Sequence, residues 1–286
     1  MNALKKSKLY KQIKKVDNKQ WLRYSLMVLG ILALAPPVGF VAQLFGSGTI
    51  CGNLCPRMAI GENFMREFFT RTAGVAFLFI WLGITFFFGR WMCSHICPVG
   101  GLTEFGSKLL PKRLKADYPK IIDTPLFRYG FLGAYIMLPI IGMDSICCTY
   151  CSFSTVPDLF GALFVPRLGL MLTTGSRIVS ILLFVMILGV FTRDGRCHCH
   201  MVCPVGALDS IINNIGAKLK FTFRARINLE KCSGCGFCEE HCPTHAIKTD
   251  KISEIPAEID QRRCYQCRIC EGKCPTKAIF YGRQVQ

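Results

Sequence analysis

The sequence lacks the motifs by which proteins bind nucleotides or attach haem covalently. It has no glycine-rich nucleotide fingerprint after a strand, no P-loop and no C-x-x-C-H run. Hydride transfer with a nucleotide cofactor and covalent haem chemistry are therefore unsupported.

Negatively charged residues are scarce as well. The chain has 18 Asp and Glu against 35 Lys and Arg, which gives a formal net charge of +17. Such an excess can indicate nucleic-acid binding, but its distribution argues against it. The basic residues before Tyr24 are accompanied by one acid, Asp17. This pattern is typical of the cytoplasmic side of a membrane protein, so we expect lipid and not nucleic acid as a partner.

The first apolar segment has neither a twin-arginine before it nor a convincing cleavage site after it. We therefore predict that it is retained as a transmembrane helix. Crossing a bilayer takes about 20 residues, and the apolar segments that we assign to crossings are 24–44, 71–90, 129–146 and 178–192. The positive-inside rule then predicts a multi-pass protein of the bacterial cytoplasmic (inner) membrane with both termini cytoplasmic.

Cysteine, in contrast, is abundant, with 18 residues. Two runs near the carboxyl end have the pattern C-x2-C-x2-C-x3-C-P, by which bacterial-type ferredoxins bind [4Fe–4S] clusters. Three thiolates of a run reach one cluster and the fourth points to the other. The predicted ligand sets are Cys232, Cys235, Cys238 and Cys274 for one cluster, and Cys264, Cys267, Cys270 and Cys242 for the other. Zinc is the alternative for such cysteines, but two complete runs that each end in proline favour iron–sulfur clusters.

Four further pairs share the spacing C-x3-C. The predicted topology places Cys93/Cys97 and Cys199/Cys203 at the cytoplasmic boundary and Cys51/Cys55 and Cys147/Cys151 at the periplasmic one. The first two pairs have nearly the same sequence around them, which indicates an internal duplication. We expect a third [4Fe–4S] cluster at the cytoplasmic boundary. The periplasmic cysteines form either a further cluster or disulfides, which that compartment favours.

Two cysteines are left over by this scheme, Cys148 and Cys197. Each is either a substitute ligand or an inert buried thiol. The histidines beside the cytoplasmic pairs, His95, His198 and His200, are expected to donate hydrogen bonds to cluster sulfur or to face lipid headgroups, with a metal or haem ligand role as the alternative.

The predicted fold class is mainly α, a four-helix transmembrane bundle with a carboxyl-terminal two-cluster ferredoxin domain of α+β type. The predicted parts are a basic cytoplasmic segment, the bundle with its C-x3-C pairs, a linker and the ferredoxin domain, at residues 1–23, 24–203, 204–226 and 227–286.

The combination of apolar helices, C-x3-C-P pairs and two ferredoxin runs resembles the NapH-type membrane ferredoxins and the membrane half of NosR-type proteins, which are membrane components of quinol dehydrogenases. The resemblance implies electron transfer between the quinone pool or a cytoplasmic donor and a periplasmic redox protein, either an iron–sulfur protein or a multihaem cytochrome. It covers Cys93/Cys97, Cys199/Cys203 and the ferredoxin cysteines. Cys51/Cys55 and Cys147/Cys151 depart from it.

We therefore predict a membrane electron-transfer subunit that forms a conduit of iron–sulfur clusters. It makes or breaks no substrate bond unless quinol is oxidised at the membrane sites. Two other functions fit the same cysteines: a metal-reducing assembly factor of the copper type, and a membrane anchor that docks a ferredoxin without a conduit.

Overall fold

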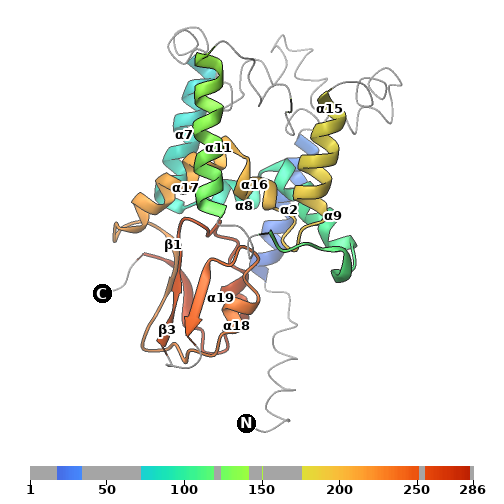
Figure 1. Cartoon of the computed structure of the whole chain (residues 1–286). Helices are drawn as coiled ribbons and strands as arrows, with labels where there is room; N and C mark the ends of the chain where they lie inside the picture. The colour runs from blue at the N-terminus through green and yellow to red at the C-terminus, as the bar shows by residue number, and fades with distance from the viewer. Residues whose placement is uncertain are drawn as a thin grey trace.

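The computed structural model describes residues 18–33, 72–118, 124–141, 150, 176–250 and 255–283. Helices occupy one part of the molecule and a small α+β module the other, with the short helices α8 (Trp91–His95) and α16 (Cys197–Met201) near the middle (Figure 1). The predicted sites at Cys51, Cys55, Cys147, Cys148 and Cys151 lie outside the described residues.

The helical part contains the predicted duplication. One unit consists of α7 (Thr72–Phe88), α8 (Trp91–His95) and α9 (Pro98–Leu109). The other consists of α15 (Ser176–Val179) continued by the π-helix η2 (Ser180–Val190), then α16 (Cys197–Met201) and α17 (Pro204–Ala217). In both units a cysteine caps the last helix and proline follows it, where the missing N–H costs no hydrogen bond.

The two units exchange partners when they pack. Helix α9 lies against η2 of the other unit, and α17 lies against α7. Gly189 of η2 allows the close approach to α9, since a Cβ there would come within 2.6 Å of Thr103 Cγ2. Near their amino-terminal ends, which follow the two C-x3-C pairs, α9 and α17 also approach the other unit, since a Cβ on Gly100 would meet Arg196 and one on Gly206 would meet Arg90.

Two further helices cover the units. Helix α2 (Asn18–Ala33) packs on α8 and α9, and α11 (Thr124–Ile140) packs on α16 and α17. Leu132 and Tyr135 of α11 form a buried cluster with Ala207 of α17. A short 3-10 turn, η1 (Lys112–Leu114), follows α9. The segment 204–226, predicted to be a linker, holds all of α17.

The α+β module contains two pairs of antiparallel strands and two short helices. Strand β1 pairs with β4, and β2 pairs with β3, with a bulge between Lys248 and Asp250. The elements are β1 (Arg224–Ile227), α18 (Phe237–Glu240), β2 (Ile247–Asp250), β3 (Ile255–Ile259), α19 (Ile269–Lys273) and β4 (Ile279–Gly282). Its core is formed by small apolar side chains and by cysteines.

The predicted transmembrane bundle is wrong for the described residues. The described parts of the apolar segments form helices, yet within these ranges none is both long and apolar enough to cross a bilayer. The longest, α7 and α11, have 17 residues each, which is roughly 25 Å of helix against a hydrocarbon core of about 30 Å. The prediction of a multi-pass inner-membrane protein with both termini cytoplasmic rested on these segments and is corrected with them.

Candidate iron–sulfur sites

The cysteines of the two ferredoxin runs surround two separate hollows in the α+β module. One hollow is lined by Cys232, Cys235, Cys238 and Cys274. The other is lined by Cys242, Cys264, Cys267 and Cys270. The fourth cysteine of each run thus lies with the first three of the other run. This is the exchange that a two-cluster ferredoxin requires.

The loops around the hollows share one backbone conformation. In the first run Gly234 and Gly236 have φ of 61° and 75°, and in the second the corresponding residues Gln266 and Arg268 have φ of 60° and 62°. Left-handed backbone costs a residue with a Cβ roughly 1–2 kcal/mol. The second run adopts this conformation without glycine. This indicates that the free energy gained by placing the thiols around the hollow exceeds the local cost in the backbone.

Hydrogen bonds to sulfur also repeat between the runs. The Sγ atoms of Cys242 and Cys274 each accept a backbone N–H at 3.3 Å, from Ala246 and Ala278. The Thr276 hydroxyl lies 3.5 Å from Cys274 Sγ. Burial raises the pKa of Cys274, but hydrogen bonds from Thr276 and from backbone N–H groups outweigh it, so the pKa is lowered. These contacts favour the thiolate, which is the form that binds iron.

A third group of thiols lies where the two helical units meet. Cys97 and Cys203 are the capping residues of α9 and α17, and a Cβ on Gly100 of α9 would lie 3.6 Å from Cys199 Sγ. Burial, with a smaller contribution from the nearby Cys97 and Cys203, raises the pKa of Cys199 to about 12. Cys93 is similarly close to Cys97. Cys97 thus lies near both Cys93 and Cys199, and Cys203 lies near Cys199.

One member of this set has a competing partner. The Cys93 thiol donates a hydrogen bond to Asp209 Oδ2 at 2.9 Å. The same carboxyl accepts hydrogen bonds from Trp81 and Thr85, and burial raises its pKa. For Cys93 to bind iron as a thiolate, this contact must be rearranged or Asp209 must be protonated.

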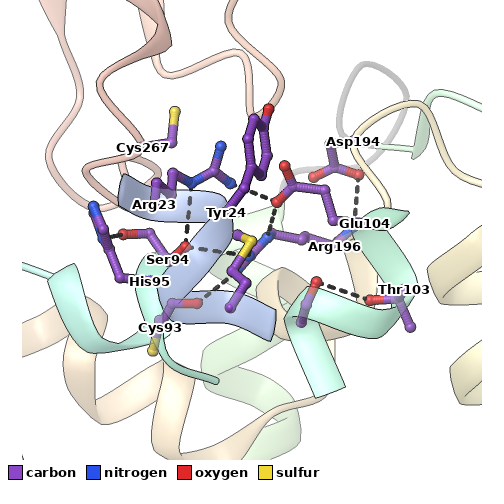
Figure 2. A network of polar contacts seen from close by, with 12 residues as sticks. Arg23, Tyr24, Cys93, Ser94, His95, Thr103, Glu104, Asp194, Arg196 and Cys267 are labelled. Carbon is purple, nitrogen blue, oxygen red and sulfur yellow. Dashed lines mark hydrogen bonds and ion pairs between the residues drawn. The ribbon is translucent and has the colours of Figure 1, made fainter. Parts of the chain in front are cut away.

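A buried ionic network separates this thiol set from the α+β module (Figure 2). Glu104 of α9 pairs with Arg23 of α2 at 2.5 Å and with Arg196, which precedes α16, at 2.7 Å. Arg23 also donates to the Ser94 carbonyl at 3.2 Å, and Arg196 donates to the Cys93 carbonyl. Burial by itself raises the pKa of Glu104, but Arg196, Arg23 and Lys108 reverse this and lower it to about 2.

The other side of the network touches the ferredoxin loop. The guanidinium groups of Arg196 and Arg23 lie 5.1 and 5.9 Å from the centre of the Tyr265 ring. Gln20 donates to the Cys267 carbonyl at 3.0 Å. The hollow lined by Cys264 and Cys267 is therefore the one that faces the Cys93/Cys97/Cys199/Cys203 set.

The other residues singled out in the sequence are buried beside these sites. His200 lies against Tyr265, with ring centres 5.6 Å apart. Cys197 is fully buried, with its Sγ 3.1 Å from Met201 Sδ in an apolar cluster. His198 lies against Phe184 and His95 is stacked on Trp91, and burial is the main cause that lowers the pKa of His95 to about 4. All three histidines beside the pairs are buried, so none of them faces lipid headgroups.

Sequence reasoning missed the charged residues around the thiols. Arg23 belongs to the segment predicted to be basic and cytoplasmic, yet it is at most 1% exposed, as are Arg90 and Arg128. Glu104 was not singled out at all. The available signal was the repeat itself, since an arginine stands three residues before the first cysteine of both pairs, at Arg90 and Arg196.

The donor sets fit cubane clusters better than single ions. In the part of the chain that the structure describes, no three His, Cys, Asp or Glu side chains converge closely enough to hold one ion. A cubane takes each thiolate on a different iron, so its ligands are spread around a hollow. Both hollows of the α+β module have this form.

Comparison with known proteins agrees with this chemistry. A family model described as "4Fe-4S binding domain" matches residues 25–69, 70–116 and 176–222, and the last two matches cover the duplicated units. A second, described as "4Fe-4S dicluster domain", matches residues 231–278. The chain therefore carries several 4Fe-4S ferredoxin-type domains. No solved structure matches it.

Two relatives have names that concern electron transfer. The chain is 27% identical to "Putative electron transport protein YccM" of Escherichia coli (strain K12), with 82% of this chain and 62% of that protein aligned. It is 28% identical to "Methylamine utilization ferredoxin-type protein MauN" of Methylobacillus flagellatus, over 76% of this chain and 72% of that protein. These findings support an iron–sulfur protein of ferredoxin type. The more specific resemblance to NapH- and NosR-type proteins stays a prediction.

Proposed function

We propose that this chain transfers electrons through three [4Fe–4S] clusters. Cys232, Cys235, Cys238 and Cys274 would hold the first, Cys242, Cys264, Cys267 and Cys270 the second, and Cys93, Cys97, Cys199 and Cys203 the third. The observation that carries the proposal is the exchange of the fourth cysteine between the two hollows. Each cluster would supply a one-electron redox centre, and the chain fixes where the centres lie.

Burial suggests which end meets a partner. Cys235 is exposed, whereas Cys270 of the second set is buried and its neighbour Tyr265 is 3% exposed. A separate redox protein, either an iron–sulfur protein or a multihaem cytochrome, would therefore dock beside Cys235. The second set lies between this end and the third set, since the Arg23–Glu104–Arg196 network joins them.

Counting iron and acid-labile sulfide tests the proposal. The chain purified without oxygen should hold about twelve of each, since each of three cubanes has four. Cys203→Ala should lower both to about eight. The matched control is Cys197→Ala, which removes a nearby buried thiol that bonds to Met201 and should leave the content unchanged.

Other iron counts would contradict the proposal or change the number of clusters. About eight iron atoms in the unaltered chain would restrict the function to that of a two-cluster ferredoxin. An equal loss in Cys203→Ala and Cys197→Ala would contradict the third ligand set. About sixteen would indicate a further cluster, as predicted for Cys51, Cys55, Cys147 and Cys151.

A further inference from the structure

Arg90 and Arg196 occupy the same place in the two duplicated units. Each stands three residues before the first cysteine of its C-x3-C pair and is the residue that precedes the short helix. Both are at most 2% exposed. The arginines also face each other's unit, because a Cβ on Gly100 would meet Arg196 and one on Gly206 would meet Arg90.

The two arginines differ in what neutralises them. Arg196 is paired with Glu104, the seventh residue after Cys97, at 2.7 Å. The seventh residue after Cys203 is Ser210, which has no charge and donates to the Arg262 carbonyl. Within the described part of the chain, none of the three guanidinium nitrogens of Arg90 has a hydrogen-bond partner. Burying a charge without hydrogen bonds is costly, so a partner is expected at this position.

The surroundings of Arg90 show which kind of partner fits. Arg90 directly precedes α8, three residues before Cys93. A Cβ on Gly206, three residues after Cys203, would lie 3.4 Å from Arg90 Nη2. The guanidinium therefore lies beside members of both cysteine pairs of the third set. The charged side chain that acts on it from α17 is the buried Asp209, whose carboxyl accepts the hydrogen bond from the Cys93 thiol.

A second arginine adds positive charge at this place. Arg128 is 1% exposed, and its Nη2 has no hydrogen-bond partner among the described residues. Burial and the nearby Arg90 lower its pKa to about 9. Two buried guanidinium groups that repel each other are tolerated more easily if an anion lies beside them.

We propose that Arg90 binds the anionic sulfur of the cluster held by Cys93, Cys97, Cys199 and Cys203, and that its charge raises the reduction potential of that cluster. The inference rests on the proposed function and adds the residue that sets the potential. When one electron moves from the second cluster to the third, the third becomes more negative by one charge and the second less negative by one. A fixed cation beside the third cluster stabilises its reduced form more than its oxidised form, so Arg90 favours transfer in this direction.

Redox titration followed by electron paramagnetic resonance tests the inference on the loaded chain. Arg90→Gln should lower the ratio of reduced to oxidised third cluster about tenfold at a fixed applied potential, which is about 59 mV for a one-electron couple. Arg90→Lys keeps the charge and should restore most of the ratio. The control Arg193→Gln removes the same charge from a side chain that is 47% exposed, where solvent screens it, and should change the ratio little.

Three results would overturn the inference. One is an Arg90→Gln titration that matches that of Arg193→Gln. Another is an Arg90→Lys chain with the same shift as Arg90→Gln, because charge would then not be what Arg90 supplies. The third is loss of the third cluster in both Arg90 variants, which would make its role purely structural. Two clusters in the unaltered chain would instead contradict the proposed function, and that count is made before any variant is titrated.

Discussion

Glu104 is the anion that two buried arginines share, and its removal tests the network between the sites. Glu104→Gln keeps the size of the side chain but leaves Arg23 and Arg196, which are 0% and 2% exposed, without their carboxylate. A carboxyl whose pKa falls from 4.5 to about 2 is stabilised as an anion in the folded chain by roughly 3 kcal/mol. Breaking a buried ion pair by removing one partner typically costs about 3–5 kcal/mol. Both lines of reasoning predict that Glu104→Gln lowers the free energy of unfolding by roughly 3 kcal/mol.

Thermal unfolding of the cluster-loaded chain without oxygen, followed by circular dichroism, measures this loss. For a chain of this size each kcal/mol corresponds to about 2–4 °C, so the melting temperature of Glu104→Gln should fall by roughly 6–12 °C. Because the folded pKa is depressed, the stabilisation is fully present above about pH 4.5 and is lost as the pH falls towards 2. The difference in melting temperature between the unaltered chain and Glu104→Gln should therefore stay about the same from about pH 5 to about pH 8.

The control for this prediction is Glu230→Gln, which removes an exposed carboxyl from the α+β module. Its melting temperature should stay within about 1 °C of the unaltered chain, since substitutions of exposed residues usually change stability little. If Glu104→Gln melted at the same temperature as Glu230→Gln, the carboxylate would not stabilise the two arginines and the reasoning would be refuted.

Two further predictions concern close packing and hydrogen bonds to sulfur. Gly30→Ala should destabilise the chain by about 1–3 kcal/mol, since a Cβ at Gly30 would lie 2.1 Å from the Ile96 carbonyl. Gly83→Ala, which meets nothing within 4 Å in the middle of α7, should be neutral or stabilising by up to about 1 kcal/mol, and equal melting temperatures for the two variants would contradict the close approach. Thr276→Val should lower the reduction potential of the cluster at Cys274 alone, because it removes an O–H group that lies 3.5 Å from the sulfur. Thr244→Val is the counterpart at Cys242, and a titration in which both variants change the same signal would exclude this assignment.

The ferredoxin module could be predicted because its information is local. The spacing of the two runs alone predicts which cysteine lies with which, and the hollows have that grouping. The near repeat around Cys93/Cys97 and Cys199/Cys203 likewise predicts two similar units. What the repeat could not predict is that the units exchange partners, with α9 on η2 and α17 on α7.

The charges around the third set could not be read from the sequence. Arg23 and Glu104 are separated by 81 residues, and Arg196 and Glu104 by 92. A rule that counts basic residues near apolar segments treats such arginines as solvent-facing loop charges. The same apolar segments also suggested a membrane bundle, because hydropathy does not show where a helix ends. Only the bounds of the helices give the lengths that decide whether they can cross a bilayer.

Helix α2 explains how charges at this junction can act strongly on neighbouring sites. Gln20 contacts the Cys267 carbonyl and Arg23, less than a turn further on, contacts the Ser94 carbonyl. Met27, on the same helix, is fully buried. The helix therefore contacts the loops of the second and third thiol sets at once. A charge buried there interacts more strongly with its neighbours than one at the surface, which is why Arg23 needs the carboxylate of Glu104. Helix α2 is thus a part of the packing between the two thiol sets and not only a flanking segment.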